Sequence, residues 1–166
     1  NASATGDTVT VTSAGDLQGS GTGPHISATT ATLSAAGGIG NTTQVKIAGA
    51  TSIDADTTGN GAAINLANSS ALATTLSSPN TTGTGASITI AQSGGGALSA
   101  TSVTTTDGAI TLSNAGANLT VGTSVNAAGA GRDVSLTTTG TGNVVLTGTT
   151  TAADQVLIGF TSTSTL

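Results

Sequence analysis

The sequence predicts an all-β fold, a parallel β-solenoid with about three short strands per turn of roughly 17–24 residues. Three observations support this prediction. Pairs of aliphatic residues at positions i and i+2 recur along the chain, their spacing is regular, and very few aromatic or charged residues separate them. The segments "GASITIAQSG" (85–94) and "DGAITLSNAG" (107–116) show the pattern, in which a strand-like stretch ends in a turn of small residues.

The composition favours a core made of stacked strands. The 166 residues include 25 Gly and one aromatic residue, Phe160, but no Met, Trp, Tyr or Cys. A core without aromatic side chains needs a geometry that Val, Ile, Leu and Ala can fill, and stacked short strands provide one. Hydrophobic residues make up 36% of the chain and charged residues 5%, a balance that argues against disorder.

The aliphatic pairs, called anchor pairs below, define the expected core. Successive side chains of a strand point to opposite faces, so each pair faces inward and the residue between faces outward. From Ile64 onward the first members lie 24, 22, 24 and 22 residues apart, and Ile26 divides the longer interval from Val9 to Val45. Stacked turns join the pairs into continuous columns. The expected core columns consist of Val9, Val11, Val45, Ile47, Ile64, Leu66, Ile88, Ile90, Ile110, Leu112, Val134, Leu136, Val156 and Ile158.

Two further apolar positions complete each turn. The second position follows each first anchor by seven to ten residues and is occupied by Leu17, Leu33, Ile53, Leu72, Leu98, Leu119 and Val144. The third is less regular and is occupied by Leu76, Val103, Val125 and Leu146. These positions predict two more strands per turn, with Gly, Asn and Asp at the corners, where a positive φ is often required.

Neither end of the sequence carries a Pro-rich, charged or helical cap. Uncovered end turns offer unpaired N–H and C=O groups to a neighbouring chain. We therefore expect residues 1–166 to form a single solenoid domain, as an excerpt of a longer solenoid or as a filament subunit. The expected partner is another solenoid end, so that self-association is end to end.

The charge pattern excludes some classes of partner. The net charge is −5, and the two cationic residues, Lys46 and Arg132, are too far apart in the sequence to form a stripe that binds phosphates. We therefore expect no binding to nucleic acid. No apolar run approaches the roughly 18 residues of a membrane span, so no such span is predicted. The scarcity of Lys and the abundance of Ser, Thr, Gly and Ala favour an extracellular or cell-surface location.

The segments "GAITLSNAGANLTVGTSVNAAGAG" (108–131) and "RDVSLTTTGTGNVVLTGTTTAADQVLI" (132–158) resemble the repeats of filamentous-haemagglutinin-type exoproteins and of autotransporter passenger adhesins of Gram-negative bacteria. The resemblance covers most of the chain and is strongest from about residue 85. It implies a right-handed β-helix that carries adhesion or serves as a surface stalk. The secretion-targeting domain of that family is not visible in this sequence.

One acidic cluster is a candidate for binding Ca²⁺. Asp54 and Asp56 lie on the same face of an extended segment, and Asn60 follows in the next turn. Carboxylate and amide oxygens are suitable Ca²⁺ ligands, but a third carboxylate and the distal Glu of an EF-hand loop are missing. A solvated corner after Ile53 is therefore the favoured interpretation, and no metal or other cofactor is predicted.

The sequence does not predict an enzyme. His25 is the single histidine and stands next to Pro24, which favours a turn residue over the base of a catalytic triad. Asp54 and Asp56 could form the carboxylate pair of a glycosidase. The aromatic platforms and basic residues of a sugar-cleaving groove are absent, however, so we expect no catalytic centre.

Two surface features remain. Outward Thr residues are typical of ice-binding solenoids, but the expected column Thr10, Lys46, Asn65, Thr89, Thr111, Ser135, Leu157 is mixed. Sequons of the form N-x-[ST] begin at Asn1 and at four candidate glycosylation sites inside the chain, most of them in expected corners. The four candidates are Asn41, Asn68, Asn80 and Asn118.

The leading functional hypothesis is an extracellular structural or adhesive β-solenoid that forms a surface filament or adhesin stalk by stacking of repeats. A host surface or glycan is a possible ligand. The alternative is a pilin-like β-sandwich subunit that assembles by donor-strand exchange. Minor alternatives are an ice-binding and a Ca²⁺-binding solenoid. The β-sandwich does not explain the recurring 22- and 24-residue spacing.

Overall fold

The computed structural model describes residues 2–161, which contain strands and no helix. All pairs of neighbouring strands run in parallel. The strands are β1 (Ala2–Ser13), β2 (Ile26–Ala35), β3 (Val45–Ala48), β4 (Ser52–Thr57), β5 (Ile64–Ser69), β6 (Thr74–Leu76), β7 (Asn80–Thr84), β8 (Ile88–Ser93), β9 (Leu98–Asp107), β10 (Ile110–Ala115), β11 (Leu119–Ala127), β12 (Val134–Thr139), β13 (Val144–Leu146), β14 (Thr149–Ala152) and β15 (Val156–Thr161).

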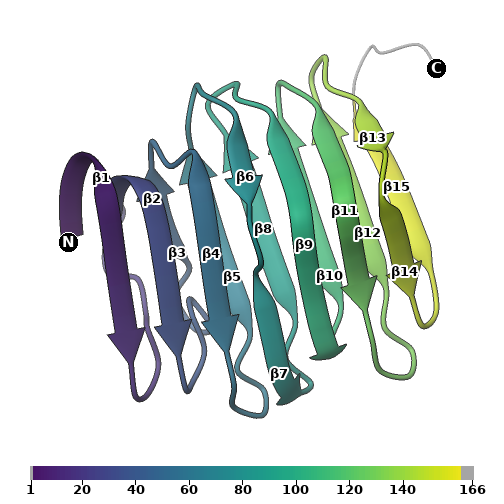
Figure 1. Cartoon of the computed structure of the whole chain (residues 1–166), viewed down its shortest axis with the longest axis horizontal. Coiled ribbons are helices and arrows are strands. Elements are labelled where there is room, and N and C mark those ends of the chain that lie inside the picture. Colours follow the sequence, from purple (N-terminus) through teal and green to yellow (C-terminus); the bar gives the residue numbers. More distant parts are fainter. Residues whose placement is uncertain (1, 162–166) are drawn as a thin grey trace.

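The strands form two facing layers. Sheet A contains β4, β6, β7, β9, β11, β13 and β14, and sheet B contains β3, β5, β8, β10, β12 and β15. Strand β2 belongs to both, because Ile26 and Ser27 pair with β3 whereas residues 30–35 pair with β4. Strand β1 pairs along β2 at the N-terminal end. In Figure 1 the chain descends through sheet A in front, ascends through sheet B behind and advances from β1 towards β15.

The chain is therefore a right-handed parallel β-solenoid of about seven coils, which confirms the predicted fold class. Each coil contributes one strand to sheet B and one run to sheet A. That run is divided into two strands in β6/β7 and in β13/β14, and the register of β11 against β9 shifts between Val121 and Ser124. Parallel coils exclude the β-sandwich architecture of the alternative subunit, which requires antiparallel sheets.

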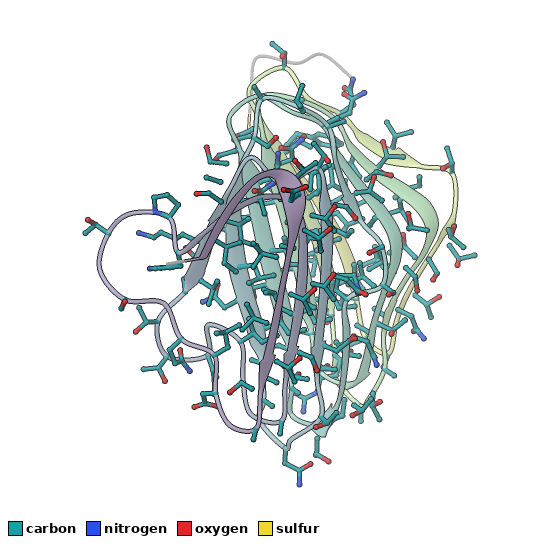
Figure 2. The ribbon with its side chains drawn as sticks, turned by 60° about the vertical axis from the view of Figure 1, so that its left-hand side comes forward. Atoms are coloured by element: carbon teal, nitrogen blue, oxygen red, sulfur yellow. The ribbon has the colours of Figure 1, made fainter. Side chains whose placement is uncertain are left out.

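The anchor pairs from Ile64 onward form columns in sheet B. Ile64, Ile88, Ile110, Val134 and Val156 are paired in succession along the rod. The first four are fully buried. In β10 the buried residues alternate with half-buried outward ones. Side chains fill the space between the two layers, as Figure 2 shows.

The register predicted for Val45 and Ile47 is wrong by two residues. The partner of Ile64 in the preceding coil is Ile39, whereas Val45 pairs with Leu66. Both members of the pair are buried, so their inward orientation is as expected. The shift arises because the loop 40–44 is inserted between Ile39 and Val45, at a place where later coils continue directly.

The assignment of Val9 and Val11 to the same columns is also wrong. These residues lie on sheet A, where Val9 pairs with Ala31 and Val11 pairs with Leu33. Leu17 occupies the sheet B position instead, in a bridge to Ile39. Apolar and polar residues alternate in the same way in both sheets, and the pattern therefore does not distinguish them.

Leu72 is not a core residue, because 66% of it is exposed in a corner. The core position in sheet A belongs to Leu76, which pairs with Ile53 and with Ala100. The corner after β5 therefore includes Leu72, and the sheet A strand β6 begins at Thr74, later in the chain than the spacing predicts.

Candidate functional site

The acidic pair lies on the outer side of β4 in sheet A. Asp54 and Asp56 are half-buried, and Ser78 Oγ donates a hydrogen bond of 2.9 Å to Asp54 Oδ1. Partial burial raises the pKa of Asp56, the charge of Asp54 raises it further, and a hydrogen bond from the backbone N–H of Asn80 opposes both effects. The two carboxylates therefore repel each other on the same side of β4.

Asn60 has a structural role in the corner after β4. Its Oδ1 accepts a hydrogen bond of 3.0 Å from the backbone N–H of Thr84, which lies in the next coil. Within the described part of the chain, no three His, Cys, Asp or Glu side chains come close enough together to hold a metal ion. Of the three candidate ligands, Asn60 is therefore hydrogen-bonded to a neighbouring coil. No third carboxylate among the described residues completes a site with Asp54 and Asp56.

The glycosylation candidates differ in accessibility. Asn41 is exposed in the loop 40–44, and Asn118 is exposed in the corner before β11. Asn80 is half-buried and accepts a hydrogen bond of 3.0 Å from Thr104 Oγ1. Asn68 is wrong as a candidate because it is 1% exposed. Its Nδ2, the atom that would carry the glycan, donates three hydrogen bonds inside the rod, to Ala50 O, Thr74 Oγ1 and Gln92 Oε1.

Asn68 belongs to a buried polar column that sequence reasoning missed. The column continues through Gln92, Asn114 and Thr138 at the end of sheet B. Asn114 Nδ2 donates to the carbonyl oxygens of Gly96, Ala117 and Asn118 at 2.9–3.1 Å. These side chains satisfy carbonyl groups that the strand ladder leaves free at the corner.

Hydroxyl groups serve the opposite corner in the same way. Thr57, Thr81 and Thr105 are buried, in successive coils, at the corner where sheet A ends. Thr81 Oγ1 donates a hydrogen bond of 2.7 Å to Ala86 O, and Thr57 and Thr105 make equivalent bonds. The sequence signal for these buried polar corners was a polar residue that recurs at the inward position at the end of each alternating strand.

Two extra loops interrupt the first two coils on sheet B, namely residues 18–25 and residues 40–44, called the paired loops below. Gln18 Oε1 accepts hydrogen bonds from the backbone N–H groups of Thr42, at 3.1 Å, and Thr43, at 3.0 Å. The loop that joins β1 and β2 stands out from the body of the rod in Figure 2. The paired loops are the largest departure from the repeat and contain the single histidine.

His25 fastens the first loop to β3. Its Nδ1 accepts a hydrogen bond of 2.9 Å from the backbone N–H of Lys46. Nε2 lies 3.0 Å from the backbone nitrogen of Ser20 and 2.9 Å from Ser20 O, so both ring nitrogens are in hydrogen-bond contact with the backbone. This geometry makes His25 a turn residue, as expected.

The first loop forms one wall of a groove on the outer side of sheet B. The groove has a volume of about 420 Å³. Thr22 and Pro24 lie on the loop side, and Lys46 Nζ donates a hydrogen bond of 3.0 Å to Thr22 O. Small residues of β3, β5 and β8 form the floor, including Ala48, Ala67, Ser69 and Ser93.

Arg132 links three coils at another corner. Its Nε donates to Asp107 Oδ1 at 2.8 Å, and Asp107 Oδ2 accepts a hydrogen bond of 3.1 Å from the backbone N–H of Gly85. The hydrogen bond from Arg132 is the largest cause that lowers the pKa of the Asp107 carboxyl, followed by the bond from Gly85. Lys46 and Arg132 thus serve separate sites.

Across residues 2–161, no helix is long and apolar enough to span a bilayer. A comparison with known proteins found no matching family model, no matching curated protein and no matching solved structure.

Proposed function

We propose that this chain is a structural rod of the extracellular surface, a segment of a filament or adhesin stalk that extends by stacking coils. The observation that carries the proposal is the register of the stacked coils, whose columns run unbroken to the last described coil. Val156 and Ile158 are each 42% exposed, although they continue columns whose preceding members, Val134 and Leu136, are fully buried. In sheet A, Leu146 is 46% exposed above the fully buried Val121.

A further coil in the same register would cover these residues. Burial of a whole aliphatic side chain stabilises by about 1.5–3 kcal/mol, and these side chains are little more than half buried before the next coil is added. The added coil would also pair the outer backbone edges of β14 and β15, which have no partner strand among residues 2–161. Several such contributions act together at one end, which is why the coil end rather than the side of the rod is the proposed assembly surface.

The first coil offers a matching surface to a second copy. A groove of about 270 Å³ is lined there by apolar Val11, Leu17, Ile26 and Val45, among others. The sheet B column that begins at Leu17 ends at Val156, so a copy stacked head to tail would place its Leu17 next in the same column. Strand direction is preserved in both sheets by this arrangement.

The sides of the rod are suited to contact with water and to adhesion. Outward positions of sheet A carry polar residues in register, for example the row Ser34, Asp56, Asn80, Thr104 and Asn126. Their hydroxyl and amide groups can bind polar surfaces without large apolar patches. The scarcity of Lys, with two cationic residues in all, supports an extracellular location.

Sedimentation velocity combined with electron cryomicroscopy tests the proposal. The chain should form head-to-tail assemblies whose strands repeat at about 4.8 Å along the axis. The double substitution Val156→Asp with Ile158→Asp should leave monomers with an unchanged far-UV circular dichroism spectrum. Thr111→Asp, on the outer side of β10, is the matched control and should assemble normally. Monomers of the unsubstituted chain at high concentration, or normal assembly of the double variant, would contradict the proposal.

A further inference from the structure

The groove beside the first loop, bounded by Thr22, Pro24, Lys46, Ser69 and Ser93, has the features of a ligand site. Its volume of about 420 Å³ falls within the usual range for small-ligand pockets. Coils from β8 onward pass this position without an inserted loop, so the solenoid itself does not need one. Loops held on a rigid scaffold are where binding residues concentrate.

Lys46 supplies the groove with a cation that has no anionic partner among the residues that the structure describes. Of the two cationic residues, Arg132 is paired with Asp107, whereas Lys46 Nζ makes one hydrogen bond, to the neutral Thr22 O. An ammonium group has three hydrogens to donate, so two of them are available to a ligand. No acidic residue lines the groove. The ligand chemistry that matches this ammonium is an anionic oxygen group, such as a carboxylate.

The rest of the groove fits a polyhydroxylated ligand. Ser69 is exposed and its hydroxyl makes no hydrogen bond within the described chain, and Ala48 and Ala67 provide a flat floor of small side chains. Ser93 Oγ donates to Asn68 O at 3.3 Å and keeps its lone pairs for a donor. Strands β3, β5 and β8 are paired on both sides, so a peptide cannot bind here by adding a strand.

We propose that this groove binds a carboxylate-bearing sugar, a hexuronate unit of an acidic polysaccharide, with the carboxylate at Lys46 Nζ and the sugar hydroxyl groups at Ser69 and Ser93. The inference deepens the adhesive part of the proposed function and rests on it. It assigns recognition to the side of the rod, so that binding and coil stacking use separate surfaces.

Titration of the full chain with a tetramer of galacturonic acid, followed by two-dimensional NMR at low ionic strength, tests the site. Amide signals of residues 22–24, 46–48 and 69 should shift on binding. The fully methyl-esterified tetramer is the ligand control, because it keeps the ring hydroxyl groups and loses the negative charge. It should bind about tenfold more weakly or not at all.

Two variants test the residues separately. Lys46→Gln removes the charge and keeps hydrogen-bond donors, and Ser69→Asp places a negative charge on the floor without touching the loop. Each should weaken binding of the acid tetramer about tenfold or more. Thr111→Asp adds the same charge elsewhere on the outer side of sheet B and should retain most of the affinity.

Four results would overturn the proposal: no shifts with the acid tetramer, equal binding of the ester, unchanged affinity in both variants, or tighter binding of a tetraglutamate peptide than of the sugar. Sedimentation of the same variants separates this proposal from the rod. Variants that no longer bind the sugar but still assemble leave the proposed rod function intact. Loss of assembly with retained sugar binding would contradict the rod function but not the sugar site.

Discussion

A single amide group holds the corner after β10 together. Asn114 is buried, and its Nδ2 donates to three carbonyl oxygens, those of Gly96, Ala117 and Asn118. Gly96 belongs to the corner before β9 in the neighbouring coil, whereas Ala117 and Asn118 form the corner of the same coil. One side chain therefore fixes both the shape of a turn and its contact with the turn beside it.

Replacing Asn114 with Leu should lower the free energy of unfolding by about 3 kcal/mol, because the branched shape is kept while buried carbonyl groups lose their donor. Urea unfolding followed by far-UV circular dichroism measures the change. Asn143→Leu is the control, since Asn143 is exposed and its side chain makes no hydrogen bond to any described residue. A loss below about 1 kcal/mol for Asn114→Leu would show that water replaces the amide group.

Asp56 should make the rod less stable as the pH rises. Its pKa in the folded chain is raised above that of the unfolded chain by partial burial and by Asp54. Between the two pKa values the folded state binds more protons, so the stability of the fold decreases as the pH rises through the folded-state value. The charged form is then the unfavourable one at neutral pH.

Substituting Asn for Asp56 should consequently raise the melting temperature at pH 7 and change it little at pH 3. The amide oxygen can still accept the hydrogen bond from the backbone of Asn80. Differential scanning calorimetry at both pH values measures the effect, with the exposed Asp154→Asn as control. A lower melting temperature at pH 7 would mean that the carboxylate binds a cation or a donor that stabilises it.

At the scale of elements, the sheet B strands of the later coils were predictable and the corners were less so. Ile88, Ile110 and Val134 predict their strands correctly, because no loop is inserted between the two members of each anchor pair. The loop 40–44 breaks this rule after Ile39, and a period of about twenty cannot reveal a local insertion that a shorter corner partly offsets. The register of Val45 was missed for this reason.

The candidate site was less predictable than the fold. Asn68 reads as an exposed sequon because buried and corner Asn residues look the same in a repetitive sequence. The groove depends on the side of the rod from which the first loop projects. It also depends on Lys46, which lies 21 residues from His25 in the sequence but contacts it in the structure. Neither fact is local, so no pattern in the sequence contains it.

Corners also need glycine where one coil touches the next. A Cβ atom added to Gly108, in the corner between β9 and β10, would lie 2.0 Å from Ala86 O, a backbone atom of the adjacent coil. Ala86 is itself fully buried, which leaves the two backbones little room to separate. The close approach sets the spacing of the coils at this corner.

Gly108→Ala should therefore destabilise the chain by about 3 kcal/mol or more, through displacement of the adjacent coil. Gly23→Ala is the matched control, because a Cβ at Gly23 in the first loop meets nothing within 4 Å. It should change stability by less than about 1 kcal/mol. Guanidinium unfolding of both variants measures the difference, and equal effects would mean that the coils separate freely at the Gly108 corner.

The whole molecule is close to one-dimensional, since each coil contacts the coils on either side and little else. In such a structure stability is approximately a sum of coil terms and of interfaces between neighbours. A central coil has two interfaces, whereas the last one has a single interface and exposed Val156 and Ile158. The same chemical change should thus have different consequences at the centre and at the end.

Leu112 and Ile158 provide that comparison because they belong to one column, with Leu136 between them. Leu112 is fully buried, so Leu112→Ala should lower the free energy of global unfolding by about 2–5 kcal/mol. Ile158→Ala should instead speed hydrogen exchange of the β15 amides and leave those of β8 and β10 nearly unchanged, because the last coil can open without the others. Native-state hydrogen exchange of both variants in the monomeric state distinguishes the two responses. Uniformly faster exchange in the Ile158→Ala variant would show that the seven coils unfold as one cooperative unit, and stacking of a further coil would then stabilise the entire rod rather than its end.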